Sequence, residues 1–158
     1  MVCHRLLDIA RVYLVSPEFA VLVLSCAVLV FYPKPVTFFG SEIIRQGSVL
    51  QYIALLPIGL LITSYRLSKD ILGPLEGEKN RVLYEWPNYW RLKVRALAAL
   101  FFCLGAAITG VILWVFKTHI PPGLLGTGFV AAIMIALIST ITLFLGYLRL
   151  REILRGGP

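Results

Sequence analysis

The side chains that most often carry out chemistry are few in this chain, and they form no catalytic or metal-binding pattern. Cys3, Cys26 and Cys103 contain no CxxC pair, and the last two fall inside long apolar runs, where cysteine usually serves as a small apolar residue. The GxSxG, HExxH, P-loop and dinucleotide-binding motifs are also absent from the sequence. We therefore expect no enzyme activity, no cofactor and no metal site.

One segment has the composition of a binding surface, because it combines aromatic and basic residues. Trp, Tyr and Arg dominate the energetics of protein interfaces, so this segment is a candidate recognition surface. Trp and Tyr also anchor helices at the surface of a bilayer, where basic side chains reach anionic headgroups. An interfacial anchor is the simpler interpretation, and both remain open. The candidate binding residues are Tyr84, Trp86, Tyr89, Trp90 and Arg91.

The elements that must position these residues are apolar. Hydrophobic residues make up 59% of the chain and its mean hydropathy is +0.86, which is above the usual range of soluble domains. Asp, Glu, Lys, Arg and His are absent from 19–33, 46–65, 96–116 and 120–148. A charged side chain at the centre of a membrane helix costs roughly 2.5 to 3.5 kcal/mol, so charge-free runs of this kind are typical of membrane spans.

The sequence thus predicts an all-α polytopic membrane protein with four transmembrane helices. A span needs about 20 helical residues to cross the hydrocarbon layer. We expect a single membrane domain over 1–158, because the longest hydrophilic connection, 66–95, is too short to form a core of its own. The predicted spans cover about 14–33, 46–65, 96–116 and 124–147.

The first of these spans depends on residues at its start. Its charge-free run is short, so it must include Ser16, Pro17 and Glu18, which suit an N-cap, a first helical position and a positive helix N-terminus. In this interpretation Glu18 lies near the headgroups. A cleaved signal peptide is the alternative, but the sequence lacks a convincing small-residue cleavage site.

The distribution of basic residues predicts the orientation. Twelve Lys and Arg residues lie in the N-terminal tail, the connection 66–95 and the C-terminal tail, whereas Lys34, Arg45 and Lys117 alone lie in the two short connections. The positive-inside rule therefore places both termini and 66–95 in the cytoplasm, and the two short connections face the periplasm or its equivalent. The expected location is the bacterial inner membrane. His4 and His119 then lie on opposite sides of the membrane and cannot share a site.

Within the spans, the polar and conformationally special residues have ordinary structural explanations. Pro57 predicts a kink in the second span. Ser139 and Thr140 could line a polar path, although such hydroxyls also bond to carbonyls in the preceding turn. No acid or base is expected in the middle of a span, which argues against coupled transport. Small residues at helical spacing are expected to pack the third and fourth spans together, with a homodimer interface as the alternative: Ala106, Gly110, Gly128, Ala132 and Ala136.

The expected partners are the lipid bilayer, with its anionic headgroups, and another membrane protein. The net charge of +7 does not predict nucleic-acid binding, because the basic residues flank the spans and form no single soluble patch. The four-span layout with both ends inside resembles that of the inner-membrane immunity proteins that protect bacteria against pore-forming toxins. The resemblance implies toxin neutralisation, in which helix faces intercept the apolar hairpin of the toxin. The alternatives are a subunit or assembly factor of a membrane complex, or a small transporter or channel like the four-helix multidrug exporters, which carry a membrane-embedded acid that this chain is expected to lack.

Overall fold

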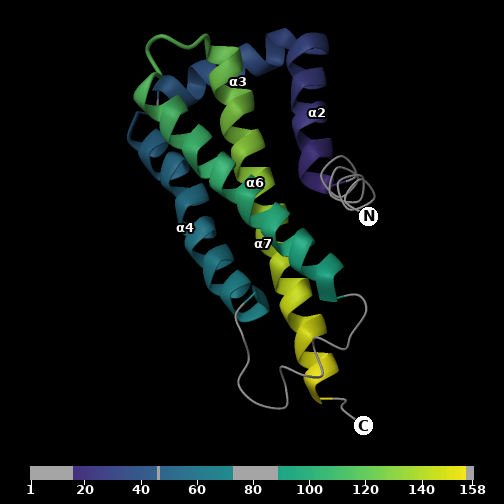
Figure 1. The fold of residues 1–158 in the computed structure, drawn as a ribbon. Helices are drawn as coiled ribbons and strands as arrows, with labels where there is room; N and C mark the ends of the chain where they lie inside the picture. The colour runs from purple at the N-terminus through teal and green to yellow at the C-terminus, as the bar shows by residue number, and fades with distance from the viewer. Residues whose placement is uncertain (1–15, 46, 73–88, 156–158) are drawn as a thin grey trace.

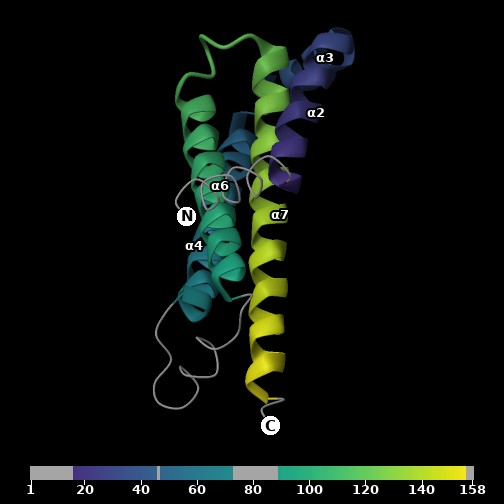
Figure 2. The ribbon, with the colours of Figure 1, turned by 45° about the vertical axis from the view of Figure 1, so that its right-hand side comes forward.

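The computed structural model describes residues 16–45, 47–72 and 89–155, and over these ranges every regular element is a helix. Helices α4, α6 and α7 run up and down beside one another, α3 crosses one end of this bundle, and α2 lies along only the first half of α7 (Figures 1 and 2). The prediction of an all-α fold is confirmed for the described residues. The helices are α2 (Pro17–Phe31), α3 (Pro33–Arg45), α4 (Gly47–Leu72), α6 (Tyr89–Val115) and α7 (Pro122–Arg155).

The lengths and compositions of the helices support a membrane protein. Helices α6 and α7 are each long and apolar enough to cross a bilayer, at about 40 Å and about 51 Å. Helices α2 and α3 reach the same standard only as a pair, which is bent by 104°. Two helices, or three if the bent pair is one span, therefore have the character of membrane spans among the described residues.

The first predicted span differs most from expectation. Its start is as predicted, since Ser16 caps α2 by accepting a hydrogen bond from the Phe19 backbone N–H at 3.1 Å. The helix then ends at Phe31, and the chain turns sharply at Tyr32. With 15 residues α2 is about 22 Å long, which is less than the roughly 30 Å of a hydrocarbon layer.

Helix α3 differs from the prediction, in which 34–45 is a short connection between two spans. Pro33 and Pro35 lie in its first turn, where a missing N–H costs no helical hydrogen bond. It buries Val36 and Gly40 on the face that crosses the start of α7. Gly40 packs directly against the Pro122 backbone, and Gly126 of α7 lies against the Gly40 backbone. Because Gly40 and Gly126 have no side chains, the backbones of α3 and α7 can cross closely at this point.

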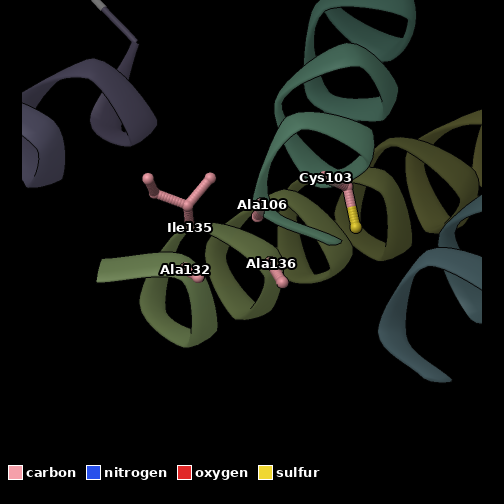
Figure 3. Packing of buried hydrophobic residues seen from close by; sticks show 5 residues of the cluster. All are labelled: Cys103, Ala106, Ala132, Ile135 and Ala136. Atoms are coloured by element: carbon pink, nitrogen blue, oxygen red, sulfur yellow. The ribbon is translucent and has the colours of Figure 1, made fainter. Parts of the chain in front are cut away.

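The interior of the bundle contains three clusters of buried apolar side chains, of which the middle one joins α6 to α7. Figure 3 shows Ala106 of α6 facing Ala132 and Ala136 of α7, with the Cys103 side chain beside them. Three of the five predicted packing residues therefore lie together within one chain. Gly128 of α7 also packs against α6, at Leu113, whereas Gly110 faces the Ala54 carbonyl and Pro57 of α4.

Candidate functional site

A groove of about 450 Å³ lies between α2 and α6, with α7 as its floor. It exists because α2 packs mainly against α7 and hardly touches α6. Leu22 and Leu29 line the α2 wall, and Gly105 lines the α6 wall. The floor on α7 includes Gly128 and Ala132. A volume between about 300 and 1,000 Å³ with apolar walls is typical of ligand-binding sites.

The shape of the groove suits an elongated apolar ligand. Along α7 its lining runs from Leu124 to Ile135, a distance of about 17 Å, which is roughly the thickness of one leaflet. Small residues on the floor and on the α6 wall bring the backbones of both helices close to the surface. Membrane helices associate where small residues allow such an approach. The groove can therefore receive one face of an apolar helix.

Glu18 and Arg95 form an ion pair beyond the inner end of the groove lining. Glu18 lies one helical turn before Leu22 on α2, and its carboxylate oxygen Oε2 is 3.5 Å from Nη2 of Arg95 on α6. The Glu18 side chain is 1% exposed and the Arg95 side chain 30%. The position at the N-terminus of α2 also favours the negative charge of Glu18.

Glu18 is buried inside the protein, and its depth in a bilayer stays a prediction. Val21, three residues later, packs against the middle cluster that contains Cys103 and Ala132. Because α2 begins about halfway along α7, its first turn lies inside the bundle (Figure 2). Glu18 lies in the first turn of α2, near the start of the predicted span 14–33. A buried ionisable residue of this kind is a candidate functional residue.

Ser139 adds a second polar group at the same end. It follows Ile135, the last groove residue of α7, by one helical turn, and it is fully buried. Within the described parts of the chain, the buried side-chain atoms that lack a hydrogen-bond partner are Oε1 and Oε2 of Glu18 and Oγ of Ser139. Thr140 differs, since it bonds to the Ala136 carbonyl and to Ser64 of α4. These buried polar atoms belong to residues that lie beyond the groove lining.

The candidate binding residues of the aromatic and basic segment lie elsewhere. Tyr84 and Trp86 are outside the described residues. Tyr89 is 8% exposed, and its hydroxyl donates to the Ile71 carbonyl at 3.3 Å, which ties the start of α6 to the end of α4. Trp90 and Arg91 are exposed at the end of the bundle opposite α3 (Figure 1).

The remaining residues singled out from the sequence are also distributed through the fold. Helix α4 continues through Pro57, which is buried against α6. Cys26 lines the groove, whereas Cys103 is fully buried. Over the described ranges, no group of three or more His, Cys, Asp or Glu side chains could hold a metal ion.

The groove could not be predicted from the sequence, because it depends on the relative positions of α2, α6 and α7. A partial signal was present, since Glu18, Leu22, Ser25 and Leu29 share one face of α2 by their spacing. Comparison of the chain with family models, with curated proteins and with solved structures found no match.

Proposed function

We propose that this chain is a non-enzymatic integral membrane protein that binds a membrane-embedded helix of another protein in the groove between α2 and α6. The observation that supports this proposal most directly is the groove itself, which is apolar, about one leaflet long and floored by small residues. Binding of a helix in an apolar groove is a common mode of recognition, and in lipid it depends on close packing. The groove contains no set of residues for covalent chemistry.

The biological role that fits this proposal best is immunity against a pore-forming toxin in the bacterial inner membrane. One helix of the apolar hairpin of the toxin would bind in the groove and would then be unable to line a pore. The supporting features are the lateral groove and the layout that resembles immunity proteins. Cells that express the protein should keep their membrane potential when challenged with the toxin that it recognises. If every pore-forming toxin in a panel depolarises expressing and control cells alike, immunity is excluded.

The proposed topology has four crossings, of which the first ends with α2 and the second is α4 beside α6. Both ends of the chain and the connection between α4 and α6 are cytoplasmic. The excess of Lys and Arg on that side supports this arrangement. Helix α3, with exposed Phe38 and Phe39, then lies at the outer surface, where amphipathic helices bind the interface.

Cysteine labelling tests this topology. In a variant without the native cysteines, Lys69→Cys and Thr118→Cys each place one exposed thiol at opposite ends of the bundle. A maleimide that cannot cross membranes should label residue 118 in intact cells and should label residue 69 only after the cells are opened. Labelling of residue 69 from outside would contradict the proposed orientation.

Filling the groove tests the binding site. A Cβ at Gly105 meets no atom within 4 Å, so Gly105→Leu should occupy the groove without disturbing the core. Leucine also has a higher helix propensity than glycine. We expect this variant to reach the membrane in normal amounts but to require at least tenfold less toxin for depolarisation, because the partner helix is displaced.

Gly59→Leu is the matched control, since Gly59 also has open space around it but lies on α4, outside the groove. It should protect as well as the unmodified protein. Full protection by Gly105→Leu would overturn the assignment of the groove as the binding site, even if immunity itself were established.

A small transporter is the second candidate, and one specific observation favours it. Glu18 is a buried acid within the bundle, which is the feature that four-helix multidrug exporters carry. Arg95 offsets its charge, however, so the site is not an isolated carboxylate. Efflux of ethidium from cells that express the protein, lost in Glu18→Gln, would support transport over partner binding.

A further inference from the structure

The end of the bundle opposite α3 carries basic side chains at one level on three helices (Figure 1). The level is defined by Gly146 of α7, where a Cβ would lie 3.3 Å from Cδ1 of Leu92 on α6 and 3.5 Å from Cδ1 of Ile71 on α4. The bases lie within five residues of these positions, which is about 8 Å along a helix axis. This basic band consists of Arg66 and Lys69 on α4, Arg91, Lys93 and Arg95 on α6, and Arg149 and Arg151 on α7.

Most charges of the basic band have no acidic partner. Within the described ranges, the salt bridges at this end join Arg95 to Glu18 and Arg149 to Glu152. The other five bases form no salt bridge with a described residue, and Asp70 is the remaining described acid at this level. The connection 73–88 adds three acids and two bases to the sequence at this end. The band therefore has an excess of positive charge.

Exposed apolar or aromatic side chains border the basic band on all three helices, at Tyr65, Leu97 and Leu148. Each lies within two residues of a base, on the side towards the middle of its helix. A ligand that fits this surface needs an anionic group at the level of the bases and an apolar part beside them. Anionic phospholipids combine these two features, whereas a soluble acidic protein or free phosphate lacks the apolar part.

Two bases of the band are held in place by aromatic rings. Nζ of Lys93 lies 5.4 Å from the centre of the Tyr89 ring, and Cζ of Arg151 lies 5.4 Å from the centre of the Tyr147 ring. Both rings are anchored at the end of α4, because the Tyr89 hydroxyl donates to the Ile71 carbonyl and Tyr147 packs against the cluster that contains Ile71. An ammonium has three N–H donors and a guanidinium has five, so donors remain for a phosphate.

We infer that the basic band binds the headgroups of anionic phospholipids, and that Lys93 and Arg151 hold their phosphates. Side chains that are already fixed lose less conformational entropy when they bind a ligand, so these two bases contribute more than the exposed Arg66 and Lys69. The lipid site lies outside the groove and is independent of what the groove binds. It also favours the anchor interpretation of Trp90 and Arg91, which are exposed at the same level.

Quenching of tryptophan fluorescence by brominated lipids tests the inference. Trp90 is exposed and lies one helical turn before Lys93, so it reports the lipids beside the basic band. Trp114 is exposed near the other end of α6 and is the matched reporter. Each becomes the single tryptophan when the other two are replaced by Phe. The variants are reconstituted in vesicles of phosphatidylcholine and phosphatidylglycerol in equal amounts, with bromine on one lipid or the other.

Trp90 should be quenched more strongly by brominated phosphatidylglycerol, with an apparent preference of about fivefold over phosphatidylcholine. High salt should reduce this preference, because it screens charges at a surface. Trp114 should show almost no preference, since Lys34 and Lys117 are the described bases of that end without a salt bridge. Equal quenching of Trp90 by the two lipids, or the same preference at Trp114, would overturn the inference.

Charge variants test the two bases named above. Lys93→Gln/Arg151→Gln should lose most of the preference at Trp90. The matched control Arg66→Gln/Lys69→Gln removes the same charge from the band and should keep most of it. Lys93→Arg/Arg151→Lys should also keep it, because both cations remain over their rings.

A loss in the control as large as that in Lys93→Gln/Arg151→Gln would overturn the role given to Lys93 and Arg151. A loss in the conservative exchange Lys93→Arg/Arg151→Lys would do the same. Inorganic phosphate distinguishes lipid from free phosphate as the ligand. If it abolishes the preference while chloride at the same ionic strength does not, the band binds free phosphate and the lipid inference is wrong.

Discussion

Arg95→Leu is expected to destabilise the protein by about 3 to 5 kcal/mol, because it leaves the buried Glu18 carboxylate without a cation. Glu18 is 1% exposed and accepts no hydrogen bond that could replace the ion pair. Glu18→Leu should cost less, since Arg95 is 30% exposed and its long side chain can extend towards water. The free energy of unfolding in mixed micelles is the quantity to measure for each variant.

The double variant Glu18→Leu/Arg95→Leu should recover most of this loss and unfold within about 1 kcal/mol of the unmodified protein. Replacement of a buried ion pair by apolar residues removes two desolvation costs at once. Equal effects of the two single substitutions, or a double variant no more stable than Arg95→Leu, would show that the pair is not buried in the folded protein.

The ion pair also affects the groove. Helix α2 packs mainly on α7, and the ion pair between Glu18 and Arg95 links it to α6. The pair therefore fixes the inner end of the groove at a defined width.

The long helices could be predicted from the sequence because the absence of charge is a local signal. The predicted spans 96–116 and 124–147 lie almost entirely within α6 and α7. The helices extend further at their charged ends, since Lys and Arg are good helix formers. Membrane composition thus identifies these helices well but locates their ends less closely.

The site could not be predicted in the same way, because depth in a bundle is not a local property. The prediction that Glu18 lies near the headgroups assumes a straight first span. The sharp turn at Tyr32 shortens α2, so its first turn lies beside the middle of α7. The turn itself had a signal in Pro33 and Pro35, which begin a second helix with its own apolar face.

The crossing of α3 over α7 leads to the second large effect, which is expected for Gly40→Ala. A methyl group at Gly40 would overlap the backbone carbonyl of Pro122. Backbone atoms cannot rotate away as a side chain can, so α3 must shift relative to α7. Overpacking of this kind typically costs about 1 to 3 kcal/mol, and the rigid neighbour puts this site at the upper end of that range.

A disulfide between α3 and α7 can report this shift. In a variant without the native cysteines, Thr37→Cys and Gly123→Cys lie close enough to be joined, because a Cβ at Gly123 is 3.0 Å from Cγ2 of Thr37. The pair should oxidise readily in the reporter variant and poorly once Gly40→Ala is added. Gly47→Ala is the matched control, since a Cβ there meets no atom within 4 Å.

The same substitution should weaken binding in the groove, although Gly40 does not line it. Helix α3 joins the outer end of α2, so a shifted α3 also moves the α2 wall. We expect cells that express Gly40→Ala to be depolarised by less toxin than cells that express the unmodified protein, because the substitution alters the width of the groove. Cross-linking and protection that both match those of Gly47→Ala would show that α3 does not cross α7 at Gly40.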